Sequence, residues 1–321
     1  MDRNLALEAI RITEAAALAA ARLRGRGDRN GAGQAAVEAM RRGLGALPVD
    51  GLVVIGAGER DEAPMLYVGE RVGRCADGDD EVEMAVDSLE GTNLCATGAP
   101  NAISALVIGP RGSILRLPPA YMEKIAVGPR ARGTIDITKS PAENLRAVAA
   151  ALCKSVEDLT VVILDRPRHE KLMRKVREAG ARIKLIGDGD VVGALSTCFS
   201  ESGVDVLLGT GGASEGVVSA AALRCLGGDI QGRLAWRSDR ERERAHTLGL
   251  KDLDRILSAE DLAGGEIMFA ATGVTGGDLL NGVRFTADGA ITHSLAMRSK
   301  TRTIRYVETI HHFVGRPNYG W

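Results

Sequence analysis

Aromatic residues are scarce in this chain: Phe, Tyr and Trp together make up 3% of its 321 residues. The hydrophobic core is therefore expected to consist mainly of Ala, Val, Leu and Ile. Long apolar runs are also missing, since no stretch approaches the roughly 20 residues that a helix needs to span a bilayer. The N-terminal segment carries charges where a signal peptide has its apolar region. We therefore expect no membrane partner.

Neither sign of charge predominates. The chain has 41 Lys and Arg against 42 Asp and Glu, which gives a net charge of −1. A nucleic-acid-binding protein needs a basic excess on one face, so no nucleic-acid partner is expected. Residues 237–244 alternate Arg with Asp and Glu, and a solvated helix is favoured there over a docking patch.

Paired cysteines are absent as well. The five cysteines are widely spaced and none forms a Cys-x-x-Cys pair. An odd number of separated thiols is typical of a reduced, cytosolic protein. We therefore expect a cytoplasmic protein with buried, reduced thiols.

Glycine, in contrast, is abundant at 40 residues, which suits an α/β protein with many tight turns. The first half predicts helices over residues 4–23 and 35–44 and buried strands at 52–55 and 84–86. Residues 102–108 and 113–117 are predicted to form a hairpin through the turn at 109–112. Few helices separate these strands, so the first half is expected to be α+β.

The second half alternates regularly between strands and helices. Ser140-Pro141-Ala142-Glu143 is a capping box with Pro at the first helical position, so a helix begins there. Strands are predicted at 159–164, 182–186 and 204–208, and helices at 169–179, 191–198 and 214–226. This order predicts a parallel α/β sheet with crossover helices. We expect domains at residues 1–155 and 156–321, with the C-terminal strands returning to either one.

The most informative segment is Asp87-Ser88-Leu89-Glu90-Gly91-Thr92. An apolar strand leads into one carboxylate, and a second carboxylate follows three residues later. Gly91 allows close backbone approach to a ligand, and Thr92 supplies a hydroxyl. A magnesium-dependent phosphatase needs such oxygen ligands, although a solvated turn after a strand fits the spacing equally well.

This segment resembles the Asp-Pro-x-Glu/Asp-Gly-Thr signature of the lithium-sensitive phosphatases, which include inositol monophosphatases and fructose bisphosphatases. Its neighbours narrow the resemblance to the class II bacterial fructose-1,6-bisphosphatases, and it covers nearly the whole chain in order. The matching segments are residues 25–28, 58–59, 61–66, 121–124, 166–169, 187–190, 211–221 and 299–305. The resemblance implies a layered α/β/α/β/α sugar-phosphatase fold, a homo-oligomer (dimer or tetramer) and a role in gluconeogenesis.

The resemblance also implies a role for each matching residue. Asp87, Glu90 and Glu215 would be ligands of Mg²⁺ or Mn²⁺. Thr92 would position the attacking water, with support from Asp61, while Glu90, Gly91 and Thr92 hold the phosphate that is cleaved. The remaining substrate contacts would be Tyr121, Arg166, Pro167 and Arg168 at the distal phosphate, and Asp188, Gly189, Asp190 and Gly212 at the sugar.

Elementary chemistry supports some of these roles. Arg166 and Arg168 follow a predicted strand, at the edge where an open parallel sheet binds ligands, and two arginines suit a dianionic phosphate. From the residues alone, surface charge beside a helix start explains them equally well. Glu215 and the two aspartates near residue 189 would more often be helix-terminal residues. The adjacent pair His311-His312 is better explained by structural contacts than by metal binding.

The chain departs from the family at two acidic positions. Gly33 stands where the family has Asp, and Ala57 where it has Glu; both carboxylates belong to the family's metal cluster. Ser88 replaces the usual Pro. Three functions remain open: a phosphatase acting on the 1-phosphate of fructose 1,6-bisphosphate or a related sugar bisphosphate with an atypical metal site, a phosphatase specialised for another sugar phosphate in a biosynthetic pathway, and a non-catalytic sugar-phosphate-binding paralogue.

Overall fold

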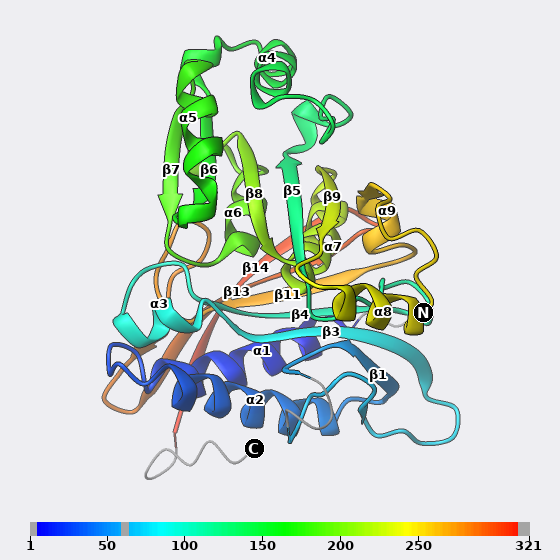
Figure 1. Ribbon diagram of the computed structural model, residues 1–321. Coiled ribbons are helices and arrows are strands. Elements are labelled where there is room, and N and C mark those ends of the chain that lie inside the picture. Colours follow the sequence, from blue (N-terminus) through cyan, green and yellow to red (C-terminus); the bar gives the residue numbers. More distant parts are fainter. Residues whose placement is uncertain (1–4, 59–63, 314–321) are drawn as a thin grey trace. The chain divides into compact units, whose positions relative to one another are not determined.

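Two helices rich in small residues open the chain: α1 (Ala6–Ala21) and α2 (Arg29–Gly45). They are seen in a computed structural model that describes residues 5–58 and 64–313. α1 is buried along most of its length, and it packs against α2 and against a sheet (Figure 1). A Cβ atom on Gly43 of α2 would lie 3.5 Å from the Ile12 Cα of α1, so the two helices cross closely. With few aromatic side chains to fill the core, the close packing here comes from small residues that let the two helices approach each other.

The sheet beside these helices is formed by eight strands, with the order β12-β13-β11-β4-β3-β1-β2 and β14 paired to β13. The short helix α3 (Thr92–Thr97) follows β3. The strands are β1 (Val49–Ile55), β2 (Arg71–Val72), β3 (Asp80–Glu90), β4 (Ile103–Pro110), β11 (Met268–Gly273), β12 (Arg284–Phe285), β13 (Gly289–Arg298) and β14 (Thr303–His312).

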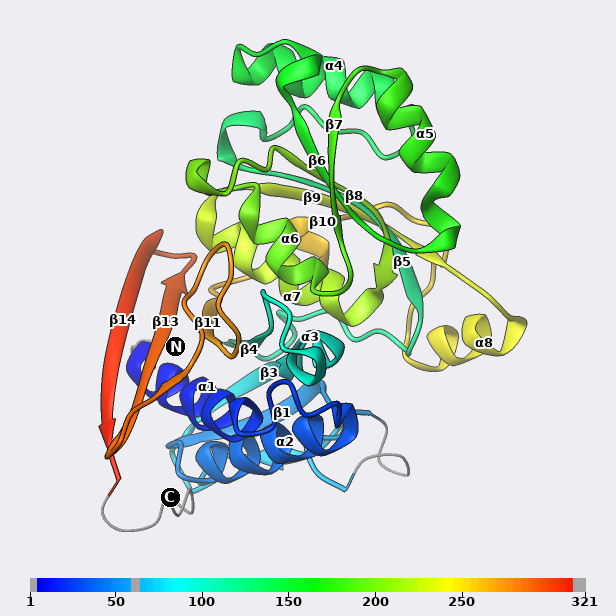
Figure 2. The same ribbon diagram turned by 90° about the vertical axis from the view of Figure 1, so that its left-hand side faces the viewer.

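A second sheet of six strands has the order β10-β9-β5-β8-β6-β7. β7, β6 and β8 run parallel, whereas β5 is antiparallel to both β8 and β9. α4 and α5 cover one face and α6 and α7 the other (Figure 2). The elements are β5 (Tyr121–Val127), α4 (Pro141–Leu152), β6 (Thr160–Leu164), α5 (Glu170–Glu178), β7 (Arg182–Ile186), α6 (Asp190–Ser196), β8 (Val206–Gly212), α7 (Ala213–Leu226), β9 (Asp229–Ala235), α8 (Asp239–Thr247), β10 (Leu257–Ser258) and α9 (Ala259–Leu262).

The two sheets belong to two compact units, one formed by Met1–Ile114 with Gly265–Trp321 and the other by Leu115–Gly264. This division differs from the expected boundary near residue 155. The segment after Ile114 joins the second unit because β5 pairs with β8 and β9, and the C-terminal strands join the first because β11 pairs with β4. The expected α/β class is confirmed, with mixed rather than purely parallel sheets.

The predicted hairpin over residues 102–117 is wrong. β4 is present, but its neighbours are β3 and β11, and residues 113–117 form no strand. The capping box is confirmed: the Ser140 Oγ accepts from the Glu143 N–H at 3.3 Å, and Glu143 accepts from the Ser140 N–H at 2.9 Å. In residues 5–58 and 64–313, no helix is long and apolar enough to cross a membrane.

All five cysteines are free, but they are not all buried. Cys95 and Cys225 are buried and Cys198 is half-buried, whereas Cys75 and Cys153 are exposed. Burial raises the pKa of the Cys198 and Cys225 thiols to about 12. The expectation of five buried thiols is therefore wrong for Cys75 and Cys153, which lie outside the strands and helices.

Candidate active site

In the first unit, a β-bulge at the end of β3 orients the two predicted metal ligands. Asp87 is opposite Ala105 of β4, and Glu90 is opposite Ile103. The two residues between them on β3 therefore lie opposite a single residue of β4. Directly opposed residues of an antiparallel pair lie on one face. Because Ala105 and Ile103 share a face, Asp87 and Glu90 share it too. A regular strand would place them on opposite faces.

The turn after the bulge depends on glycine. Gly91 has φ +82°, in the left-handed region, and a Cβ atom there would lie 2.8 Å from the Leu94 Cδ1. A side chain at this position would be strained, and it would also have to displace the end of the Leu94 side chain. The turn leads into α3, whose first residue is Thr92. The predicted order of carboxylate, glycine and hydroxyl is thus held in one short segment.

Gly33 lies in α2 beside this segment. A Cβ atom on Gly33 would be 3.8 Å from the Thr92 Cγ2, an ordinary van der Waals contact. A side chain at position 33 would therefore reach Thr92 without displacing it. Ala57 follows the end of β1, and the predicted residue Asp61 lies outside the described residues.

In the second unit, three neighbouring parallel strands end at the same edge of the sheet. The segment Arg166–Arg168 follows β6, Asp188–Asp190 follows β7, and Gly212 ends β8. Tyr121, the first residue of antiparallel β5, is paired with Gly212 and so lies at this edge too. The distal-phosphate and sugar residues predicted in this unit are therefore brought together where open α/β sheets bind ligands.

The arginines at this edge are held by separate contacts. The Arg168 guanidinium is 5.1 Å from the centre of the Tyr121 ring, and its Nε and Nη2 donate to the Thr210 carbonyl at 3.0 and 2.7 Å. The Arg166 Nη2 lies 3.7 Å from Asp188, and both side chains are about a third exposed. A partly exposed arginine pair of this kind can bind a dianionic phosphate.

Glu215 lies in the first turn of α7, half-buried. Its Oε2 accepts from the Ser214 hydroxyl at 2.8 Å. A Cβ atom on Gly212 would be 1.9 Å from the same Oε2, so a side chain at this position would have to displace the Glu215 carboxylate. Glu215 thus packs directly on one of the predicted substrate residues.

Sequence reasoning missed three residues at this edge. The Arg237 guanidinium lies 4.6 Å from the centre of the Tyr121 ring. Lys124 is buried in β5, and its Nζ contacts Asp190. His169 accepts from the Thr210 N–H through Nε2 at 2.8 Å, while its Nδ1 lies 2.7 Å from the Leu164 carbonyl. The one feature of the sequence that could have indicated such a contact is Lys124, a charged residue within a largely apolar strand.

The buried His169 ring is kept neutral by its surroundings. Burial lowers its pKa, and the nearby Arg168 and Arg166 charges act in the same direction. The hydrogen bond to the Leu164 carbonyl opposes this shift. The neutral ring donates from Nδ1 and accepts at Nε2, and thereby joins the end of β6 to β8.

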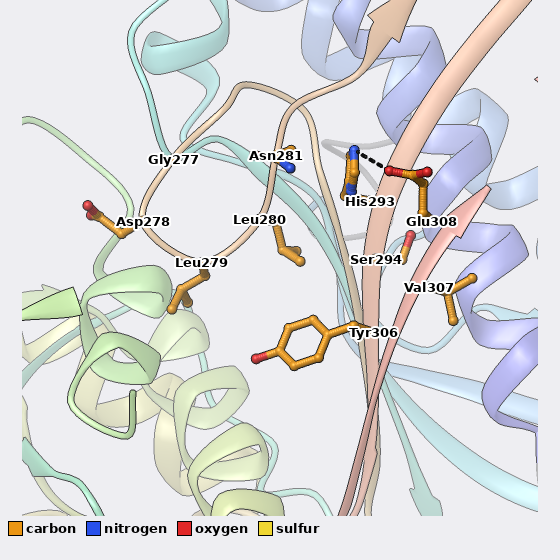
Figure 3. Close-up of a pocket in the computed structure, with 10 residues that line it drawn as sticks. All are labelled: Gly277, Asp278, Leu279, Leu280, Asn281, His293, Ser294, Tyr306, Val307 and Glu308. Carbon is orange, nitrogen blue, oxygen red and sulfur yellow. Dashed lines mark ion pairs between the residues drawn. The ribbon is translucent and has the colours of Figure 1, made fainter. Parts of the chain in front are cut away.

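A cavity of about 410 Å³ lies in the first unit, between the loop at residues 277–281 and strands β13 and β14 (Figure 3). An ion pair between the His293 Nε2 and the Glu308 carboxylate, at 3.4 Å, lies in its wall. None of its lining residues is a predicted site residue. On β14, His311 contacts the Thr292 hydroxyl at 2.9 Å and His312 lies 3.6 Å from Asp288, so these adjacent histidines make separate structural contacts.

Comparison with known proteins agrees with this arrangement. Residues 3–311 match the family described as bacterial fructose-1,6-bisphosphatase, glpX-encoded. The chain belongs to the bacterial fructose-1,6-bisphosphatase family. It is therefore a phosphoric monoester hydrolase of the fructose-1,6-bisphosphatase type.

Two cyanobacterial relatives carry the name D-fructose 1,6-bisphosphatase class 2/sedoheptulose 1,7-bisphosphatase. The protein of Synechococcus sp. (strain JA-2-3B'a(2-13)) is 47% identical over 97% of this chain and 96% of its own length. That of Synechococcus elongatus (strain ATCC 33912 / PCC 7942 / FACHB-805) is 45% identical over 98% of this chain and 97% of its own.

Bacterial fructose-1,6-bisphosphatases generally depend on a divalent metal ion. Here the bulge in β3 provides two carboxylates on one face, a donor type that suits a hard cation. Across residues 5–58 and 64–313, however, no three His, Cys, Asp or Glu side chains are grouped so that they could hold an ion. Glu215 belongs to the second unit.

Proposed function

We propose that this chain hydrolyses the 1-phosphate of fructose 1,6-bisphosphate or of a related sugar bisphosphate, such as sedoheptulose 1,7-bisphosphate. The observation that carries this proposal is the edge of the second sheet, where Arg166, Arg168 and Tyr121 meet the segment Asp188–Asp190. A cationic pair beside polar groups suits a sugar that has a second phosphate. The names of the relatives support the same substrate class.

In this proposal, Asp87, Glu90 and Glu215 would hold Mg²⁺ or Mn²⁺, and the ion would neutralise charge on the phosphate that is cleaved. Glu90, Gly91 and Thr92 hold that phosphate, and Thr92 orients the attacking water with the help of Asp61. Arg166, Pro167 and Arg168 bind the distal phosphate together with Tyr121. Asp188, Gly189, Asp190 and Gly212 contact the sugar.

The test is a phosphate-release assay on a panel of sugar mono- and bisphosphates, with Mg²⁺, with Mn²⁺ and with neither. We expect release from bisphosphates that requires a divalent ion. Calorimetry on the same panel should show tighter binding of bisphosphates than of monophosphates. If no bisphosphate is hydrolysed under any condition, the proposal is wrong.

A second candidate is a sugar-phosphate-binding paralogue without turnover. The observation behind it is that Gly33 and Ala57 stand where the family has carboxylates. Binding of bisphosphates without phosphate release would support this alternative. Efficient release from one other biosynthetic sugar phosphate would support a specialised phosphatase.

Three further properties belong to the proposal. We expect the chain to act in the cytoplasm, because its five free thiols suit a reducing compartment. We expect a homodimer or homotetramer, which light scattering on the purified protein measures. We also expect inhibition by lithium, because the segment Asp87–Thr92 resembles the lithium-sensitive phosphatases; an assay with added LiCl tests this.

A further inference from the structure

Lys124 is a charged residue inside the core of the second unit. Its side chain is 2% exposed, and it lies on β5 between the buried residues Met122 and Ile125. A buried ammonium group is costly unless it is paired and hydrogen-bonded. Its partners therefore define its role.

Those partners come from two other segments. The Lys124 Nζ donates to the Asp190 carboxylate, which is 8% exposed, and to the Gly212 carbonyl at 3.0 Å. Asp190 begins α6, and Gly212 ends β8. One ammonium group thus joins three segments that each contribute predicted substrate residues.

Two glycines bring the backbone close to this pair. A Cβ atom on Gly211 would lie 2.1 Å from the Asp190 Oδ2 and 3.1 Å from the Lys124 Nζ. A Cβ atom on Gly216 would lie 3.2 Å from the Lys124 Cδ. The junction between β8 and α7 therefore packs directly onto the ion pair.

Asp188 differs from Asp190 in this respect. Its side chain is 28% exposed and lies 3.7 Å from the Arg166 guanidinium. The carboxylate two residues later points inward to Lys124. Asp188 and Asp190, which were predicted to have the same role, therefore lie in different environments: Asp188 is accessible and Asp190 is buried.

We propose that Lys124 and Asp190 form a positioning pair that fixes the segment Asp188–Asp190 against Gly212. This narrows the sugar contacts proposed above: of the two carboxylates in the segment, only that of Asp188 contacts the sugar. This assignment rests on the proposed sugar-bisphosphate phosphatase function. Lys124 does not touch the substrate; it acts through the placement of the chain at the edge of the sheet.

The test compares wild type with Lys124→Met, Asp190→Asn and the double variant, using fructose 1,6-bisphosphate as substrate. Each single change leaves one buried partner of the pair uncompensated and should lower the unfolding temperature. Removal of both charges should restore most of it. If a single variant does not fold, the double variant carries the test.

The kinetic result distinguishes positioning from a purely structural role. We expect Lys124→Met to raise KM about tenfold or more while kcat changes by less than about threefold. The double variant should have a KM within about twofold of either single variant, because both changes remove one interaction. Asp188→Asn should raise KM further when it is added to the double variant.

A matched control is available in the same unit. Lys154 pairs with Asp205 at 2.6 Å, away from the predicted substrate residues. Lys154→Met should lower the unfolding temperature and leave KM unchanged. A folded double variant with the wild-type KM would overturn the assignment alone. A wild type that neither binds nor hydrolyses any sugar bisphosphate would overturn the proposed function and the assignment with it.

Discussion

At the scale of single residues, the spacing of Asp87 and Glu90 is informative only together with the bulge. Three residues apart on a regular strand, the two carboxylates would face opposite sides. The extra residue in β3 brings them to one face. The sequence suggests these two residues as metal ligands, but the bulge depends on pairing with β4 and could not be read from the segment itself.

Asp87→Asn tests whether this carboxylate is needed for hydrolysis. The amide keeps the shape but removes the negative charge, so we expect phosphate release to fall about a hundredfold or more while the unfolding temperature changes little. Thr92→Ala should also lose activity. Asp50→Asn, in the exposed ion pair with Arg71, is the control and should keep full activity. Full activity in both Asp87→Asn and Thr92→Ala would mean that the site lies elsewhere.

Arg168→Met tests the distal-phosphate site. Loss of a charge-assisted contact costs about 1.5–3 kcal/mol, so calorimetry should show clearly weaker binding of fructose 1,6-bisphosphate and little change for a monophosphate. Arg174 is exposed on α5 near Glu178, and Arg174→Met is the matched control. Equal losses for mono- and bisphosphates in Arg168→Met would contradict the assignment.

Gly33→Asp combined with Ala57→Glu tests the two missing carboxylates. A side chain at position 33 fits beside Thr92, so we expect the double variant to bind more metal per chain, as measured by elemental analysis. Each single change should do less than both together. Gly33→Ala adds a side chain without charge and is the control for helix effects.

Turnover of the same variants distinguishes the remaining functions. A gain in phosphate release would indicate an enzyme limited by its metal site or a binding paralogue that can be reactivated. Tighter metal binding without a gain would indicate a site already adapted to its own substrate. Unchanged metal stoichiometry would contradict the account of an incomplete site.

At the scale of elements, local signals predicted the second unit better than the first. The Ser140 capping box and the alternation of strands and helices from β6 to α7 are confirmed, because each βαβ crossover joins neighbours in the sequence. The hairpin after β4 was mispredicted because Gly109–Gly112 has the composition of a turn. The neighbours of β4 are β3 and β11. β11 lies far along the chain, and no local pattern reveals this pairing.

The His169 ring connects β6 to β8, and its protonation should loosen that connection. Burial holds its folded-state pKa below the unfolded value of about 6.5, so the unfolded chain binds the proton more readily. The stability it contributes is complete above pH ~6.5 and is lost as the pH falls toward the folded-state pKa. We expect the unfolding temperature to fall between pH 7 and 5.

The control for this prediction is His169→Gln, which should show a shallower fall over the same range. Part of the fall should remain, because burial also lowers the pKa of His311. His246→Gln, on exposed α8, should behave like wild type. An unchanged slope in His169→Gln would show that the His169 ring does not govern the pH dependence.

At the scale of the whole molecule, the reactivity of the thiols depends on how deeply each cysteine is buried within its own unit. Cys75 and Cys153 are exposed, whereas the other three are at least half-buried. A thiol with a pKa of about 12, such as Cys198, is almost entirely protonated at neutral pH and reacts slowly. We expect two thiols to react quickly with a disulfide reagent and three to react only after unfolding. Cys75→Ser with Cys153→Ser should abolish the fast phase, and a fast phase that persists would contradict this.

The order of strands in the first sheet has a consequence for how the protein is made. β11 lies between β4 and β13, yet it follows the entire second unit in sequence. A ribosome releases the N-terminus first. Residues 115–264 can therefore complete their own sheet before β11 is available to pair with β4. An apolar strand with an unpaired edge is prone to join other chains. The nascent protein therefore leaves this edge of β4 unpaired from the time β4 emerges until β11 follows the second unit out of the ribosome.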